Sequence, residues 1–196
     1  NNKINEDAIK IKLQNINHSE YNVIDIGSGY GESTIEFAKS NNARTIIACE
    51  KYIDGINNIA EKAKNSLLSN ILIFHGNAHQ LMDEYCIENS ISEMWILFPD
   101  PWPKKRHHKR RLIDVSFFNK IKKLLKKNAS INIATDSKSY LSEILRCVYN
   151  IKNDFLWINQ NKLEWDYCDL SLPKTKYYRK ALENGLNPFY LKLMKL

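Results

Sequence analysis

Three glycines at alternate positions, Gly27, Gly29 and Gly31, follow a short apolar run, and Asp25 lies just before them. Glycine permits positive φ and lets a ligand approach the backbone closely. The spacing is G-x-G-x-G, which differs from the G-x-G-x-x-G of dinucleotide-binding folds. The Asp25 carboxylate would repel a pyrophosphate, but it would tolerate the cationic ammonium and sulfonium groups of S-adenosylmethionine. Together with Glu50 and the order of the strands, described below, the loop favours a sulfonium cofactor, with NAD as the lesser alternative.

Two polar residues after later apolar runs support a nucleoside-containing ligand. Glu50 ends the second of these runs, where a carboxylate can accept hydrogen bonds from both ribose hydroxyls. Asn77 follows the third run and could bond an adenine edge. A tight turn without any ligand would explain the glycines alone. It would not explain Glu50, so we expect a cofactor site.

A second segment with chemical potential reads Phe-Pro-Asp-Pro-Trp-Pro, from Phe98 to Pro103. Its three prolines make a stiff, extended turn that presents Asp100 and Trp102 rigidly. Beside a methyl donor, a carboxylate can accept from the ring NH and the amino group of guanine, so that N7 faces the methyl group. It could instead hold an exocyclic amino group that is itself methylated. N7 carries a free lone pair and needs no base, so its methylation requires only alignment and electrostatics.

A basic run, KKRHHKRR from Lys104 to Arg111, follows this turn at once. The chain has 29 Lys and Arg against 22 Asp and Glu, and six of these cations lie in the run. They account for all but one unit of the net charge of +7. A local patch of this kind favours a polyanionic partner such as nucleic acid. A capping Asp in a proline-rich turn would not require these neighbouring cations.

Strands and helices alternate along the chain. Short runs rich in Ile and Val predict strands at Tyr21–Ile26, Thr45–Cys49, Ile71–His75, Met94–Phe98, Ile131–Thr135, Phe155–Ile158 and Phe189–Leu193. Amphipathic patterns predict helices at Asn5–Asn15, Glu32–Lys39, Ile53–Leu68, Ala78–Tyr85, Asp114–Lys127, Lys138–Tyr149 and Lys176–Asn184. This order predicts an α/β protein with a three-layer, doubly wound, Rossmann-like fold and a seven-stranded, mostly parallel sheet with one antiparallel strand. We expect one domain over residues 1–196, with residues 1–20 as a leading helical segment.

The composition is typical of a globular protein and excludes a disordered or membrane-spanning chain. The apolar fraction of 43% and the charged fraction of 26% are ordinary for a globular protein. No apolar stretch is long enough to cross a membrane, and the N-terminal residues lack a signal-peptide pattern. The cysteines form no C-x-x-C pair, and His75 and His79 straddle a strand end and a helix start. We therefore expect a cytoplasmic protein without a metal or a disulfide framework.

The stretch from Phe98 to Arg111 resembles the signature of bacterial tRNA (guanine-N7-)-methyltransferases, which are class I S-adenosylmethionine-dependent enzymes. The resemblance extends from the glycine loop to the segment around Thr175. It implies transfer of a methyl group from S-adenosyl-L-methionine to N7 of a guanosine in the variable loop of tRNA. By this resemblance the cofactor is held by Asp25, Gly27, Gly29, Gly31, Glu50, Asn77 and Asp100, and Asp100 is also the catalytic residue. The RNA would be contacted by Lys105, Arg106, His107, His108, Lys109, Arg110 and Arg111.

The same resemblance assigns substrate contacts to Lys104, Asp136, Thr175, Lys176, Tyr177 and Tyr178. Two positions depart from the family pattern: Tyr178 stands where an acid is usual, and Asp25 stands where many members have Glu. Asp136 could instead cap the helix that begins near Lys138. The lysine-rich helix after the patch favours a solvated face over an additional phosphate-binding surface.

Two alternatives remain open from the sequence. One is an amino-group methyltransferase acting on nucleic acid, because Asp100-Pro101-Trp102 loosely resembles a D-P-P-[YFW] motif. The other is a catalytically silent RNA-binding subunit that kept the fold. The expected partner is tRNA, with no membrane and no metal, and the protein is expected to be a monomer or a homodimer.

Overall fold

The computed structural model describes residues 22–165 and 172–196. The expected leading helix at Asn5–Asn15, the first residue of the first predicted strand and Cys168 lie outside this part of the chain. No helix within the described residues is long and apolar enough to cross a membrane.

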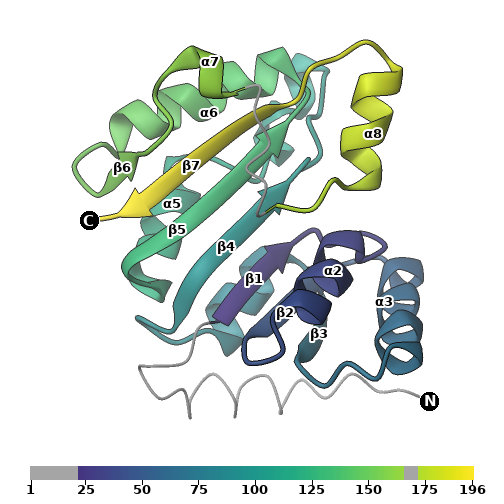
Figure 1. Cartoon of the computed structure of the whole chain (residues 1–196). Coiled ribbons are helices and arrows are strands. Elements are labelled where there is room, and N and C mark those ends of the chain that lie inside the picture. Colours follow the sequence, from purple (N-terminus) through teal and green to yellow (C-terminus); the bar gives the residue numbers. More distant parts are fainter. Residues whose placement is uncertain (1–21, 166–171) are drawn as a thin grey trace.

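A single seven-stranded sheet forms the centre of the molecule (Figure 1), with the strand order β3-β2-β1-β4-β5-β7-β6. The pairs from β3 to β5 are parallel, whereas β7 runs antiparallel to both β5 and β6. The strands are β1 (Asn22–Ile26), β2 (Thr45–Glu50), β3 (Ile71–His75), β4 (Ile91–Leu97), β5 (Leu125–Thr135), β6 (Phe155–Trp157) and β7 (Phe189–Lys195). The predicted seven-stranded α/β fold with one antiparallel strand is therefore confirmed.

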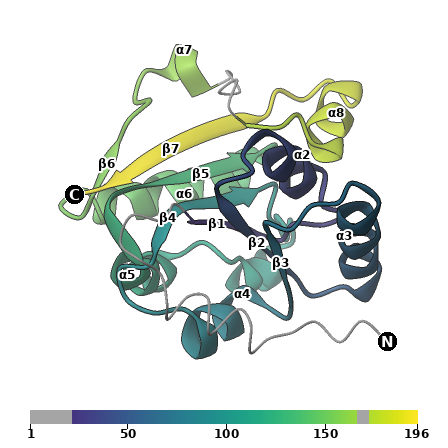
Figure 2. The same ribbon diagram turned by 60° about the horizontal axis from the view of Figure 1, so that its bottom comes forward.

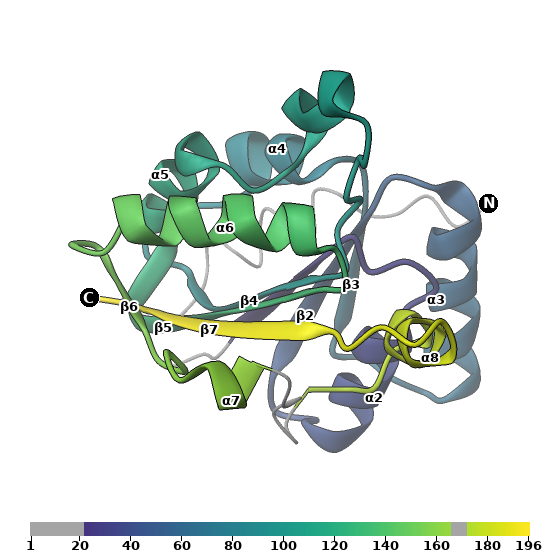
Figure 3. The same cartoon turned by 90° about the horizontal axis from the view of Figure 1, so that it is seen from above.

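Helices cover both faces of the sheet. Figure 3 shows α4, α5 and α6 on one face and α2 and α7 on the other, while α8 lies beside α2 in Figures 2 and 3. Their bounds are α2 (Glu32–Ser40), α3 (Ile53–Asn65), α4 (Ala78–Gln80), α5 (Val115–Leu124), α6 (Lys138–Asn150), α7 (Lys162–Trp165) and α8 (Lys176–Glu183). The larger apolar cluster joins the sheet to α4, α5 and α6, and a smaller one around Phe37 and Trp95 lies on the α2 face. Burial of these apolar side chains is the main force that holds the layers together.

Several elements differ from the sequence-based expectation, and three of them lie near the site or its supporting helices. The helix predicted at Asp114–Lys127 ends at Leu124, because the next residues enter β5, whose Leu125 and Ala129 are buried. The helix predicted at Ala78–Tyr85 is a short α-helical turn that continues as a π-helical segment, Leu81–Tyr85. The basic run forms a 3-10 helix, η2 (Lys105–Arg110).

The carboxyl ends of β1 to β5 meet at one edge of the sheet, which is where ligands bind in open α/β folds. The glycine loop follows β1, Glu50 ends β2, and Asn77 comes shortly after β3. The Asp100 turn follows β4 at the same edge. The topology therefore brings residues far apart in the sequence to one place.

The turn into α2 depends on a glycine at position 31. Gly31 has φ 74°, and a Cβ there would lie 2.3 Å from Cγ1 of Ile59 on α3. Gly185 has a similar φ of 68°, but a Cβ there would meet nothing within 4 Å. The two positions therefore separate the backbone cost of an added methyl group from its steric cost.

We expect Gly185→Ala to lower the free energy of unfolding by about 1 kcal/mol, the backbone cost alone. Gly31→Ala should cost about 1–3 kcal/mol more, because the methyl group overpacks the contact with Ile59. Urea unfolding of the cofactor-free protein measures both values. Equal losses in the two variants would contradict the packing described for the α2–α3 contact.

Candidate active site

A cleft of about 590 Å³ opens at the carboxyl edge of the sheet. This volume is typical of small-molecule sites, which span about 300–1,000 Å³. Many of the site residues predicted from the sequence line this cleft. They are Gly27, Gly29, Glu50, Asn77, Asp100, Lys109, Arg110, Arg111 and Tyr177. The structure thus brings together residues from the glycine loop, three strand ends, the basic run and α8.

The Glu50 carboxylate is fixed by backbone donors. Its Oε2 accepts a hydrogen bond from the Gly29 amide at 2.8 Å, and its Oε1 accepts from the amides of Lys51 at 2.8 Å and Tyr52 at 2.9 Å. The side chain is buried beside the cleft. These contacts lock the rotamer, so the carboxylate is positioned before any ligand arrives.

Gly55, on α3, also shapes the glycine loop, although the sequence analysis did not single it out. A Cβ at this position would lie only 2.4 Å from the carbonyl oxygen of Gly29. The sequence does contain a signal for this contact, because Gly55 lies inside a helical pattern. Glycine at such a position destabilises a helix by roughly 1 kcal/mol relative to alanine. The close approach of the two backbones explains why a helix here contains glycine.

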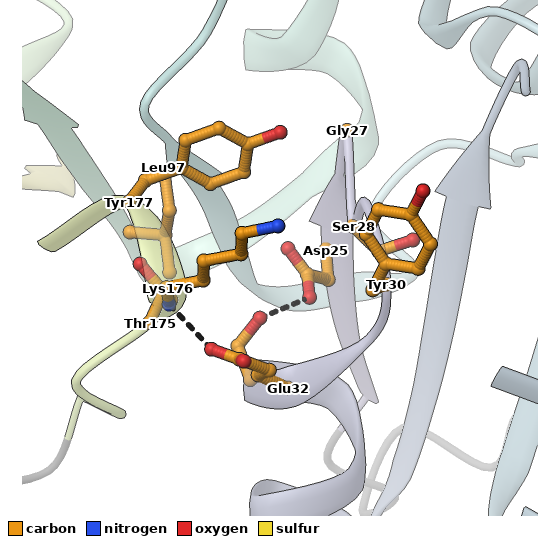
Figure 4. A pocket seen from close by; sticks show the side chains of 10 residues that line it. Asp25, Gly27, Ser28, Tyr30, Glu32, Leu97, Thr175, Lys176 and Tyr177 are labelled. Carbon is orange, nitrogen blue, oxygen red and sulfur yellow. Dashed lines mark hydrogen bonds between the residues drawn. The ribbon is translucent and has the colours of Figure 1, made fainter. Parts of the chain in front are cut away.

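Asp25 lies at a smaller cavity, of about 30 Å³, below the glycine loop. Figure 4 shows its carboxylate opposite Lys176, with Tyr30 and Tyr177 at the sides. Its Oδ2 accepts hydrogen bonds from the hydroxyls of Ser33 and Thr34, both at 2.8 Å. Complete burial raises the pKa of Asp25 to about 6, although the two hydrogen bonds oppose this shift. A carboxyl group with this pKa changes charge close to neutral pH.

Helix α8 closes this end of the site. Thr175 is its N-cap, and its hydroxyl accepts from the Tyr178 amide at 3.2 Å. The Tyr177 ring lies nearly parallel to that of Phe98, with 6.3 Å between the ring centroids, and it lines both cavities. Burial, followed by the carboxylates of Glu50 and Asp100, raises the pKa of Tyr177, so its hydroxyl stays protonated at neutral pH. The predicted residues Lys176 and Tyr177 therefore face the site directly.

Tyr178, the departure from the family pattern, lines neither cavity. Its ring is partly buried beside Tyr190, with the centroids 6.4 Å apart. A carboxylate from another element, Glu32 of α2, lies at the start of α8 instead. Glu32 accepts from the Lys176 amide and pairs with Arg179, whose Nη2 is 2.9 Å from Oε2. Only the folded structure brings Glu32 to α8.

The Asp100 turn is held in an unusual backbone conformation. Phe98 and Trp102, on either side of it, have φ of 56° and 42°, a region that side chains disfavour. Such strain persists only where the surroundings enforce it, and it clusters at functional sites. Asp100 itself is exposed to the cleft, with Oδ2 lying 3.9 Å from Nζ of Lys51. Its carboxylate is therefore open to a ligand.

Most cations of the basic run face solvent. Lys104, Lys105, Arg106, Lys109 and Arg110 are exposed, and none of them is in an ion pair within the described residues. The guanidinium carbon of Arg110 lies 4.9 Å from the centre of the Trp102 ring, and the ring of His107 meets Trp102 edge-on. Nδ1 of His108 lies 2.9 Å from Glu143. The run thus presents unpaired charge beside the cleft.

Arg111 differs from the rest of the run and corrects our expectation for it. Although it borders the cleft, only 2% of its side chain is exposed. Its Nε donates to the carbonyl of Pro101 at 2.8 Å, and its Nη1 lies 2.7 Å from Oε1 of Glu143. Its Nη2 donates to the Ser139 hydroxyl at 2.9 Å, and its guanidinium stacks over Tyr140. These partners occupy the guanidinium, so Arg111 holds the Asp100 turn against α6 and is not available to RNA.

Two further predicted residues lie in capped turns. The Asn77 side chain accepts from the Gln80 amide at 2.9 Å and caps α4, while it also lines the cleft. Asp136 follows β5 but does not line either cavity. The cap of α6 is Ser137, which accepts from the Tyr140 amide at 3.3 Å, so the suggestion that Asp136 caps this helix is wrong. The part of the chain that is described contains no group of three or more potential metal ligands.

We expect Arg111→Ala to lower the free energy of unfolding by about 1.5–3 kcal/mol, because it removes the charge-assisted hydrogen bonds of a buried guanidinium to Pro101, Ser139 and Glu143. The neighbouring Arg110→Ala, at an exposed position, should change it by less than about 0.5 kcal/mol. Chemical denaturation of both variants checks this contrast. Similar, small losses in both would show that Arg111 is not the anchor of the turn.

Comparison with known proteins supports one family. A family model described as "Putative methyltransferase" matches residues 19–191. The tRNA (guanine-N(7)-)-methyltransferase of Buchnera aphidicola subsp. Baizongia pistaciae is 36% identical over 182 residues, which cover 91% of this chain and 74% of that protein. The enzyme of the same name from Jannaschia sp. (strain CCS1) is 31% identical over 174 residues, covering 88% of this chain and 71% of that protein.

Solved structures support the fold independently. An rRNA methylase from Streptococcus thermophilus superposes with a TM-score of 0.60 at 16% identity, covering 97% of this chain and 93% of that one. The 16S rRNA methyltransferase KamB gives a TM-score of 0.63 at 14% identity, covering 96% and 91% of the two chains. These structural similarities show the methyltransferase fold, and the sequence relatives identify the family within it. The chain belongs to the tRNA (guanine-N(7)-)-methyltransferase family.

Proposed function

We propose that this protein transfers a methyl group from S-adenosyl-L-methionine to N7 of a guanosine in the variable loop of tRNA. The observation that carries the proposal is the meeting of Glu50 and Asp100 at one cleft bordered by exposed cations. Asp25 lies at the adjoining smaller cavity, which shares Gly27 and Tyr177 with the cleft. The family relationship supports the reaction and the tRNA substrate. A tRNA substrate also favours a cytoplasmic location.

The residues present fit S-adenosylmethionine. The buried Glu50 carboxylate suits two ribose hydroxyls, and Asp25 suits a cationic amino group. The glycine loop lets a ligand approach the backbone, with Tyr177 opposite. A structurally similar protein from Streptococcus mutans was solved in complex with SAH, and it superposes with a TM-score of 0.57. The bound cofactor supplies an electrophilic methyl group, and the chain supplies its position and charge environment.

Asp100 is the residue that we assign to the guanine. Its exposed carboxylate can accept from both the ring NH and the amino group, which fixes the base by two hydrogen bonds. This geometry would leave N7 free to face the methyl group. The N7 lone pair needs no deprotonation, so the site has no need of a general base. The negative charge of Asp100 also stabilises the positive charge that develops on the methylated ring.

The exposed cations of the basic run are proposed to bind the phosphates around the target nucleotide. Lys109 and Arg110 line the cleft itself, whereas Lys104, Lys105 and Arg106 lie on the neighbouring surface. Contacts of this kind fix the register of an RNA without reading its sequence. The base would then be selected by Asp100.

The reaction is tested directly with Asp100→Asn. We expect the wild-type protein to form 7-methylguanosine in tRNA, and the variant to lose at least about a hundredfold in turnover, since one amide oxygen cannot satisfy two donors and lacks the charge. Mass spectrometry of the tRNA nucleosides after incubation with labelled cofactor measures the product, and calorimetry checks that cofactor binding is kept. Near-normal turnover in Asp100→Asn would remove this residue from the guanine edge.

The role of Asp25 predicts a pH dependence for cofactor binding. Since burial raises its pKa to about 6 in the folded protein, Asp25 becomes neutral as the pH falls below 6. A cationic amino group binds the ionised form better, so the dissociation constant should rise on going from pH 7 to pH 5, by up to about tenfold per pH unit below the pKa. Asp25→Asn should bind more weakly at pH 7 and show a nearly flat profile. A wild-type profile that is also flat would exclude Asp25 from the amino-group site.

A further inference from the structure

The lysine-rich α5 looks like the natural extension of the basic run in the sequence, but its charges are partly neutralised in the fold. Nζ of Lys120 lies 2.7 Å from Asp83, and Lys122 pairs with Asp154 at 2.5 Å. Such pairs reduce the positive potential that a phosphate would meet. The interpretation of this helix as a solvated face is therefore the better supported of the two.

Helix α6 differs from α5 in that its exposed cations are not neutralised by ion pairs within the described residues. Its inner face packs Tyr140, Ile144 and Val148 into the core. Its outer face is exposed and carries Lys138, Ser142, Arg146 and Tyr149, which lie at i, i+4, i+8 and i+11 and so on one side of the helix. Lys152, just after the helix, lies over the Tyr149 ring at 4.5 Å. Within residues 22–165 and 172–196, the cations Lys138, Arg146 and Lys152 are in no ion pair.

The basic run is attached to α6 through His108 and Arg111. The only acid within α6, Glu143, is occupied by Arg111 at 2.7 Å and by His108 at 2.9 Å. Arg111 also donates to Ser139 in the first turn of α6. The helix begins directly after β5, at the edge where the cleft lies, and extends about 20 Å away from it. Figure 3 shows α6 running across the sheet on the face that also carries α5.

We propose that Lys138, Arg146 and Lys152, the α6 cations, bind the phosphate backbone of the tRNA beyond the methylated nucleotide. This inference rests on the proposed function, which places the target guanosine in the cleft and the adjoining phosphates on η2. A duplex or a folded RNA that leaves η2 meets α6 next, and it finds there three unpaired cations and no free carboxylate on the helix. The α6 cations thus serve affinity and orientation, not the chemical step.

The test compares two triple variants that remove the same number of charges. One is Lys138→Gln, Arg146→Gln and Lys152→Gln, and its matched control is Lys120→Gln, Lys122→Gln and Lys123→Gln on α5. Affinity for the tRNA is measured by fluorescence anisotropy at three salt concentrations, and steady-state kinetics give kcat and KM for tRNA. Circular dichroism confirms that both variants are folded.

For the α6 variant we expect the slope of log affinity against log salt to flatten by about 2–2.7 units, since it loses three phosphate contacts and each contributes about 0.7–0.9. Loss of the three contacts should weaken binding roughly tenfold or more at 0.15 M salt, with KM raised and kcat unchanged. The α5 control should stay within about half a unit of the wild-type slope. An α6 variant that binds like the wild type, or no more weakly than the control, would overturn the inference while leaving the proposed function intact. A wild-type protein that neither binds nor methylates tRNA would instead overturn the proposed function.

Discussion

The buried guanidinium of Arg111 is the constraint on which the catalytic edge depends. It joins the carbonyl of Pro101 to Glu143 and Ser139 of α6, with 2% of its side chain exposed. The Asp100 turn begins and ends at residues with positive φ, a conformation that costs free energy unless the surroundings enforce it. By tying the turn to a helix of the scaffold, Arg111 supplies this restraint, and Asp100 remains free to meet a ligand.

Much of the fold could be predicted from the sequence because its signals are local. Each predicted strand is a run of apolar residues, and the runs at Thr45–Cys49 and Ile71–His75 match β2 and β3 to within one residue. The edge of the sheet at which the site lies also follows from the order of the elements, since parallel strands end together. One exception is a boundary: α5 stops at Leu124 because β5 has apolar residues that extend the sheet further than the pattern indicated.

The remaining features of the site depend on contacts between distant segments, which no local pattern reports. In the sequence, Arg111 cannot be told apart from the other cations of KKRHHKRR. Its partners Ser139 and Glu143 on α6 lie 28 and 32 positions further along the chain. Glu32 reaches the start of α8 only in the folded structure, and Gly55 is needed only because the carbonyl of Gly29 lies against it. The pairing of charges also depends on the fold. Lys120 and Lys122 of α5 are paired with Asp83 and Asp154, whereas Lys138 and Arg146 of α6 are exposed and in no ion pair within the described residues.

The central claim is that this cleft directs a methyl group to the N7 lone pair of a guanine held by Asp100. A tRNA with 7-deazaguanine at the target position tests it most directly, because a C–H group replaces N7 while the edge facing Asp100 is unchanged. Methyl transfer from labelled cofactor is measured on this tRNA and on the unmodified one, together with the affinity for each. The account predicts equal binding and no methylation of the deaza tRNA at the target nucleotide. Methylation of the deaza tRNA there at the normal rate would contradict it, since the accepting atom would then lie elsewhere on the nucleotide.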